Sequence, residues 1–273
     1  LINSDKSYKL PEIPSAAVFD HVITYVPSLS LFLDSTSRFT PMGLLPEGVV
    51  GKPGLITATG QVITTPLDDV SKDKSITTTT MTLHPDGRVT GASRVEQFGY
   101  FQLLSRARIY RNQNKPQQEV VGNMLARFNE SGTGKIHHPD PLDLNAEWVV
   151  NSEYSLDPVV NLPGVVALTL PIGLAQGRFQ TLASVKATTN SKFPKICGSS
   201  SHKEVIEMSL PEESRVTRAP SEVTFKSKTL NYQASYQIAG KKIQVTRKFE
   251  ANRGRSVCGN EDDLEWDQLT KVL

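Results

Sequence analysis

The sequence has no long hydrophobic run and no clear excess of either charge. Its most apolar stretch, Pro158–Ala175, is interrupted by Asn161, Pro163, Pro171 and two glycines, which excludes a helix of roughly 20 apolar residues that spans a membrane. Lys and Arg number 30 and Asp and Glu 28, so the strongly basic surface of a nucleic-acid-binding protein is excluded as well. We therefore expect proteins, peptides or other amide-bearing molecules as partners.

Cysteine is also scarce, with two residues in the whole chain. Cys197 and Cys258 each precede a glycine in a polar, loop-like context. A disulfide between them would tie two distant loops together and indicate an oxidising compartment, whereas two buried free thiols are common in cytoplasmic proteins. The sequence leaves both possibilities open, and we favour the disulfide.

The chain lacks an initiating methionine and a signal peptide. It begins with apolar residues that are typical of a strand inside a domain, so we expect a fragment of a longer protein. Short apolar segments then alternate with Pro- and Gly-rich loops. The polar stretch 64–74 predicts a boundary between one domain at 1–66 and a second at 67–273. In the first domain we expect strands at Leu1–Asn3, Val18–Val26, Leu31–Ser35, Leu55–Thr59 and Gln61–Thr65.

The second domain combines strand and helix patterns. Asp86-Gly87 and Ala239-Gly240 indicate hairpin turns, because glycine adopts the backbone angles that tight turns require. Apolar residues at three- and four-residue steps predict a helical insertion near 98–128, and an acidic first turn predicts a helix over Asn260–Leu273. We expect strands at Ser75–Leu83, Arg88–Gln97, Glu147–Tyr154, Val165–Leu170, Lys203–Ser209, Val223–Ser227, Thr229–Ile238 and Lys242–Phe249. The predicted fold class is α+β, mainly β, with antiparallel strands and a sandwich-like second domain.

The segment 18–36 carries the residues with the clearest chemistry. It predicts a hairpin, and if Pro27 and Ser28 are the central turn residues, His21 lies directly opposite Asp34. A carboxylate in that position accepts a hydrogen bond from one imidazole nitrogen and leaves the other free to activate a nucleophile. A polar pair across two strands without catalytic function has the same pattern, so the spacing alone does not decide between the two.

Several motifs around this pair resemble a known family. The segment is similar to the end of the transglutaminase-like domain of bacterial multidomain proteins that carry flanking domains of unknown function. The resemblance rests on Phe19-Asp-His21, Leu33-Asp-Ser-Thr36, Pro41-Met-Gly43 and Leu45-Pro46. It implies a papain-like arrangement, in which a cysteine at a helix start is the nucleophile and His21 and Asp34 are the other two catalytic residues. It also implies that the cysteine precedes residue 1, so that this fragment alone is inactive.

The resemblance extends to the rest of the chain through weaker strand motifs. These motifs resemble the β-rich accessory region of the same proteins. Proteins of that family are usually exported, which agrees with a disulfide and implies a periplasmic or cell-envelope location. The motifs are Phe193-Pro-Lys-Ile-Cys197, Glu207-Met-Ser-Leu-Pro211, Tyr232-Gln-Ala-Ser-Tyr236 and Val257-Cys258. The prediction that the parent protein is an enzyme therefore rests on this resemblance. The alternative is a non-catalytic envelope scaffold or binding module with a degenerate form of this fold.

Other candidate residues have smaller expected roles. Strand alternation places Asp20 on the face opposite to His21, so we expect Asp20 and Ser35 at the rim of the site. The segment 131–135 lacks the full phosphate-binding pattern, and we predict a glycine loop there and no cofactor. His137 and His138 have no metal-ligand spacing, so we predict no metal site.

Overall fold

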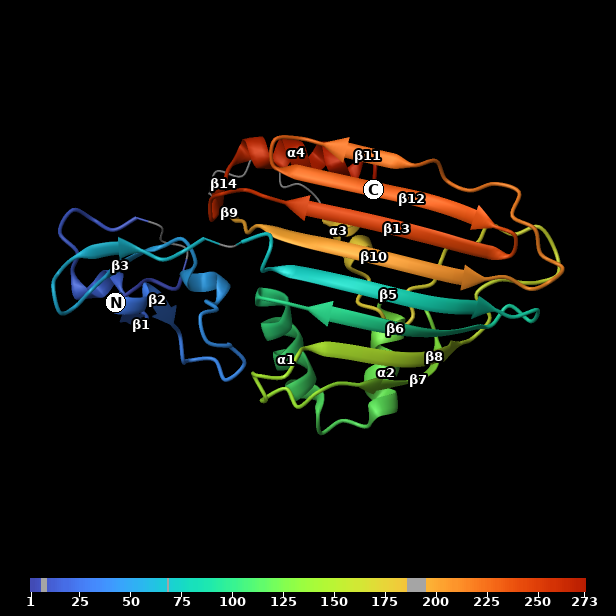
Figure 1. Ribbon diagram of the computed structural model, residues 1–273, viewed down its shortest axis with the longest axis horizontal. Helices are drawn as coiled ribbons and strands as arrows, with labels where there is room; N and C mark the ends of the chain where they lie inside the picture. Colours follow the sequence, from blue (N-terminus) through green and yellow to red (C-terminus); the bar gives the residue numbers. More distant parts are fainter. Residues whose placement is uncertain (6–8, 68, 186–194) are drawn as a thin grey trace.

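The computed structural model describes residues 1–5, 9–67, 69–185 and 195–273. It confirms the predicted fold class, because the chain is α+β and mainly β, with one large mixed sheet and small antiparallel sheets. Figure 1 shows residues 1–66 beside one end of the large sheet. The proposed division into domains at residue 66 stays a prediction.

The large sheet has eight strands in the order β11-β12-β13-β10-β5-β6-β8-β7. Neighbouring strands are antiparallel except β5 and β10, which run parallel and join the two antiparallel halves of the sheet. The strands are β5 (Lys74–Leu83), β6 (Val89–Gln97), β7 (Gly132–His137), β8 (Val149–Leu156), β10 (Ser200–Ser209), β11 (Val223–Lys226), β12 (Leu230–Ala239) and β13 (Lys242–Ala251).

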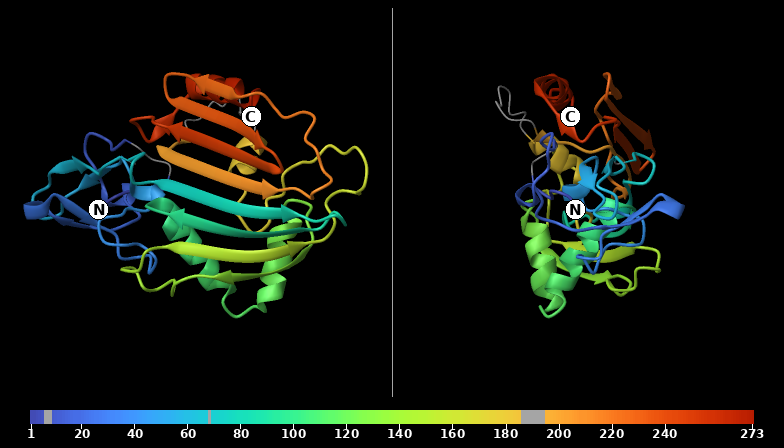
Figure 2. Two further views of the ribbon diagram at one scale, coloured as in Figure 1. Left: turned by 45° about the vertical axis from the view of Figure 1, so that its right-hand side comes forward. Right: turned by 90° about the vertical axis from the view of Figure 1, so that its left-hand side faces the viewer.

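The two faces of this sheet differ in burial because side chains alternate along each strand. In β5, Thr77, Thr79 and Met81 are buried, whereas Thr78 and Thr80 are exposed. Helices cover the buried face and leave the polar face open, as Figure 2 shows. They are α1 (Tyr100–Asn112), α2 (Gln117–Ala126), α3 (Arg178–Ser184) and α4 (Asn260–Thr270). The second layer is thus helical, and not the second sheet that a sandwich would require.

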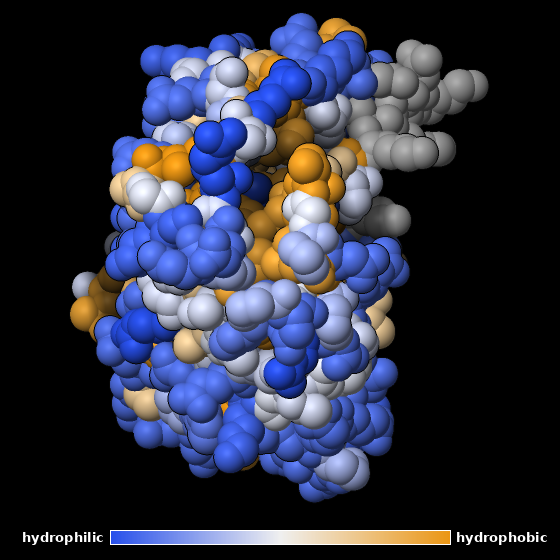
Figure 3. Space-filling model, turned by 90° about the vertical axis from the view of Figure 1, so that its right-hand side faces the viewer, coloured by the Kyte–Doolittle hydropathy of each residue, from blue (hydrophilic) through white to orange (hydrophobic). Residues whose placement is uncertain are grey.

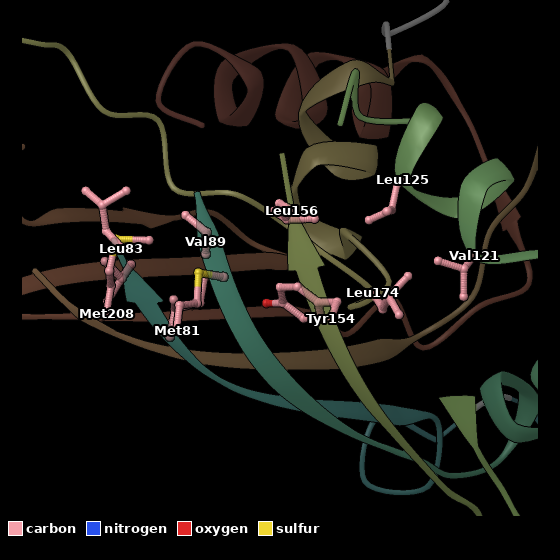
Figure 4. Close-up of a cluster of buried hydrophobic side chains, with 11 residues drawn as sticks. Met81, Leu83, Val89, Val121, Leu125, Tyr154, Leu156, Leu174 and Met208 are labelled. Carbon is pink, nitrogen blue, oxygen red and sulfur yellow. The ribbon is translucent and has the colours of Figure 1, made fainter. Parts of the chain in front are cut away.

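The main hydrophobic core lies between the sheet and α2. Figure 4 shows Met81 and Tyr154 on the strands, and Val121 and Leu125 on α2. Val121 and Leu125 are fully buried. A second cluster, which includes Leu269 of α4 and Phe249 of β13, lies under α4. Helices α2 and α4 therefore bury apolar side chains against the sheet.

Residues 1–66 form two small antiparallel sheets around a separate apolar cluster. β1 (Thr24–Val26) pairs with β2 (Leu31–Leu33), and β3 (Pro53–Leu55) pairs with β4 (Val62–Thr64). Single turns of 3-10 helix lie at η1 (Ala16–Val18), η2 (Pro27–Leu29) and η3 (Glu47–Val49). The cluster consists of buried Ile2, Leu45, Val49 and Val50. β1, β2 and β4 are shorter than predicted, and Ile2 forms isolated bridges in place of a strand at Leu1–Asn3. The strand predicted at Leu55–Thr59 is wrong, because β3 ends at Leu55 and residues 57–59 form a turn.

Most of the elements predicted for residues 67–273 are present. The hairpin around Asp86-Gly87, the helical pair, the hairpin around Gly240 and the C-terminal helix are confirmed. The glycine loop predicted at 131–135 is wrong, because Gly132 and Gly134 lie in β7 at the edge of the sheet. There the backbone pairs with β8. Small residues suit this position, since a Cβ at Gly134 would meet the backbone of β8 and the side chain of Leu174.

The strand predicted at Val165–Leu170 is also wrong. These residues belong to the long connection between β8 and α3, in which Val165 is fully exposed and Leu168 and Leu170 pack on the main core. Apolar periodicity alone does not separate such a packed loop from a strand.

Apolar side chains gather in a hollow on the end of the molecule opposite to residues 1–66, and polar side chains surround it (Figure 3).

A disulfide joins Cys197 to Cys258, as favoured from the sequence. It lies beside a two-stranded sheet of β9 (Lys195–Ile196) and β14 (Val257–Cys258), immediately before α4. Among the described residues, no helix has the length and hydrophobicity needed to cross a bilayer.

Candidate functional site

The backbone of His21 is held by the start of the chain. Ile2, which is fully buried, donates its N–H to the carbonyl of His21 at 2.9 Å and accepts the N–H of His21 at 3.1 Å. The ammonium of Lys52 donates to the carbonyl oxygens of Asn3, at 2.9 Å, and Asp5. Burial of the Lys52 amine lowers its pKa. These contacts fix the segment that in turn fixes His21.

The turn between β1 and β2 differs from the prediction. Pro27–Leu29 form one turn of 3-10 helix and Ser30 is left-handed with φ 49°, so four residues connect the strands. The pairs are consequently Thr24 with Leu33 and Val26 with Leu31. This register shifts Asp34 away from the position directly opposite His21. The ladder ends at Thr24 and Leu33, and the backbone of His21 bridges to Ile2, so His21 and Asp34 lie outside the paired part of the hairpin.

The two side chains nevertheless form a direct contact. Nε2 of His21 lies 2.8 Å from Oδ2 of Asp34. The carboxylate is almost completely buried, at 2% exposed, whereas the imidazole is 18% exposed. A carboxylate at this nitrogen favours the tautomer in which Nε2 carries the proton and donates it, and Nδ1 has the lone pair. Nδ1 is therefore the atom that can accept a proton from a nucleophile.

A third residue, Thr36, completes the surroundings of the carboxylate. Its hydroxyl donates to Oδ1 of Asp34 at 2.6 Å, and its backbone N–H donates to the same oxygen at 3.0 Å. Burial raises the pKa of Asp34, but the hydrogen bonds from Thr36 and His21 outweigh it and hold the pKa below the usual value. Asp34 is therefore ionised at neutral pH and can stabilise a positive imidazole.

Asp20 and Ser35 are the two residues predicted at the rim of the site. Asp20 accepts the backbone N–H of Ser4 at 2.6 Å, and this hydrogen bond is the main cause that lowers the pKa of its carboxyl. Asp20 thus binds the N-terminal segment and does not contact the imidazole. Ser35 is exposed, next to the buried Asp34. The role of both residues at the rim stays a prediction.

Thr36 is the residue that sequence reasoning missed. The spacing of two positions between Asp34 and Thr36 could have indicated it, because an Asp side chain commonly accepts hydrogen bonds from the residue two positions later. The same local pattern occurs at Asp69 with Ser71, where the serine hydroxyl and N–H donate to one carboxylate oxygen. Asp34 differs from Asp69 in its contact with His21 and in its burial.

The remaining candidates do not form a second chemical centre. His202 is buried between Phe101 and Phe249 and accepts a hydrogen bond from Arg178 at 3.3 Å. Burial, helped by the nearby arginine, lowers the pKa of His202 to about 3, so this ring is a neutral part of the core. No group of three or more metal-binding side chains occurs in the part of the chain that the structure describes.

Comparison of the chain with protein-family models, with curated proteins and with solved structures finds no match.

Proposed function

We propose that His21 and Asp34 are the proton-transfer pair of a transglutaminase-like cysteine hydrolase or acyltransferase that acts on amide groups of proteins or peptides. The observation that carries the proposal is the 2.8 Å contact between Nε2 and a buried carboxylate, which leaves Nδ1 for a thiol. The resemblance of the surrounding motifs to the transglutaminase-like family supports it. The family assignment is part of the proposal.

The chemistry needs a thiol, a base and an orienting acid. Nδ1 of His21 takes the proton of the thiol, and the thiolate attacks the amide carbonyl carbon. The carbon–nitrogen bond breaks as the imidazolium returns that proton to the leaving amine, and a thioester remains. Water or a second amine then attacks the thioester, gives its proton to Nδ1, and releases an acid or a new amide together with the thiol.

The thiol has to come from elsewhere. Both cysteines of this chain are joined in the disulfide, so neither Cys197 nor Cys258 is the nucleophile. We propose that a cysteine encoded before residue 1 supplies it, and that the 273 residues alone are inactive. Because disulfides persist in oxidising compartments, we place the parent protein in the periplasm or cell envelope.

The test is to express a longer protein that includes the residues encoded upstream of Leu1 in the same gene. We expect a cysteine at a helix start, alkylation of that cysteine by iodoacetamide, and ammonia release or amine incorporation with a glutamine-containing peptide. His21→Asn should slow the reaction by about 100-fold or more, the usual contribution of a general base. His84→Gln is the matched control, because His84 bonds to Thr90 in a hairpin of the large sheet. An extension without a cysteine, or an active His21→Asn variant, would refute the proposal.

A second candidate is a non-catalytic envelope scaffold. The observation in its favour is that both thiols of the chain are consumed by a structural disulfide while the His21–Asp34 contact still links two chain segments. In a scaffold His21→Asn would change only stability, by about 1 kcal/mol for a lost hydrogen bond. The extended protein would then show neither reactive thiol nor turnover.

A further inference from the structure

The carboxylate of Asp34 is constrained through both of its oxygen atoms. Oδ2 contacts Nε2 of His21, and Oδ1 accepts two hydrogen bonds from Thr36. The rotation of an aspartate carboxylate about its last bond has broad preferences, so packing or hydrogen bonds must select one orientation. Here the hydroxyl of Thr36, at 2.6 Å, provides the shortest of the three contacts.

We propose that Thr36 is a positioning residue for the His21–Asp34 pair. Its hydroxyl holds Oδ1, so that Oδ2 points at the imidazole, Nε2 keeps its proton, and Nδ1 stays open for the thiol. The catalytic meaning of this arrangement rests on the proposed function, whereas the control of the tautomer does not. Thr36 touches neither the imidazole nor the reacting atoms, and it acts through Asp34.

The positioning role of Thr36 can be tested with variants that keep the fold. The residue is exposed, and its hydroxyl is the group that valine lacks and serine keeps. Thr36→Val keeps the backbone N–H bond to Oδ1 and removes the hydroxyl bond alone. Thr36→Ser restores the hydroxyl. Ser35→Ala, one residue away and also exposed, is the control for a change in the same turn.

The first measurement uses the 273-residue chain with ¹⁵N-labelled histidine. Long-range ¹H–¹⁵N spectra at pH 9, where histidine is ordinarily neutral, report which ring nitrogen of His21 carries the proton. We expect the Nε2–H tautomer in the wild type, Thr36→Ser and Ser35→Ala. Thr36→Val should show a mixture with a substantial Nδ1–H fraction, and carboxyl ¹³C titration should show a higher pKa of Asp34, since one of the bonds that lower it is lost.

A Thr36→Val variant with the wild-type tautomer and an unchanged Asp34 titration would overturn the proposal. The same conclusion would follow if Thr36→Ser behaved like Thr36→Val, because the hydroxyl would then not be the effective group. Circular dichroism of each variant checks that the fold is retained, so that a change at His21 is not a consequence of unfolding.

The second measurement separates this inference from the proposed function. In the upstream-extended protein, Thr36→Val should lower kcat by about 10- to 100-fold, which corresponds to the loss of one hydrogen bond to a charged group, with little change in KM. Thr36→Ser should restore most of the wild-type kcat. If the tautomer changes as expected but the extended protein has no turnover, positioning by Thr36 stands and the enzymatic proposal fails. If turnover depends on His21 but not on the hydroxyl of Thr36, the enzymatic proposal stands and this inference fails.

Discussion

Removal of the disulfide should lower the free energy of unfolding by about 4 kcal/mol. Cys197 and Cys258 are separated by 61 positions in the sequence, and the chain-entropy relation gives about 4 kcal/mol at 25 °C for a loop of that length. The loop contains β10 to β13, and the bond fixes the start of α4, whose Leu269 is fully buried against the sheet. Loss of the bond should therefore loosen α4 first.

The assay is reversible urea unfolding of the wild type and of Cys197→Ala/Cys258→Ala, each with and without a phosphine reductant. The reductant should lower the midpoint of the wild type toward that of the double variant and leave the double variant unchanged. Amide hydrogen exchange should show the largest loss of protection in α4. A difference below about 1 kcal/mol would show that the reduced, unfolded chain is already constrained, and it would refute the entropic reasoning.

Three further changes test the core, the site and a turn. Leu125→Ala, at a fully buried position of α2, should cost about 2–5 kcal/mol in the same urea assay, and a cost below 1 kcal/mol would contradict the assigned packing. Because the pKa of folded Asp34 is lowered, its stabilisation is fully present above the unfolded pKa of about 4 and is lost as pH falls through the folded pKa. The stability difference between wild type and Asp34→Asn should therefore shrink below about pH 4, and a pH-independent difference would exclude this linkage. Gly87→Ala should destabilise by more than about 1 kcal/mol, because Gly87 has φ 82° and a Cβ would collide with the carbonyl of Val160; a neutral result in thermal unfolding would contradict this turn geometry.

Local turn chemistry accounts for the elements that could be predicted. Gly87 and Gly240 both adopt positive φ and close hairpins whose strands pair in continuous register. The acidic start of α4 also behaves as expected, since Asp262 accepts the N–H of Gly259 and caps the helix. In each case, residues within a few positions of each other determine the structure, and such information is fully contained in the sequence.

The errors arise where distant packing decides. Gly132 and Gly134 are strand residues because β8 offers them a partner, and no local pattern shows that partner. Leu168 and Leu170 face the core from a loop. At the site, the left-handed Ser30 lengthened the turn and changed the register, but the imidazole of His21 and the carboxylate of Asp34 still make the predicted contact.

The pair is supported from two directions by residues far away in the sequence. On one side, Ile2 pairs with the backbone of His21, and Lys52 binds the carbonyls of Asn3 and Asp5 just after Ile2. On the other, the segment after Asp34 packs on α1 of the large sheet: Arg38 donates to the hydroxyl of Tyr110 at 2.9 Å, and Phe39 meets the same ring edge-on. Helix α1 also reaches η3, where the hydroxyl of Tyr100 donates to Glu47 at 2.8 Å. Helix α1, which packs on the eight-stranded sheet, therefore contacts the N-terminal segment at Arg38 and at Glu47, and Arg38 lies four residues after Asp34.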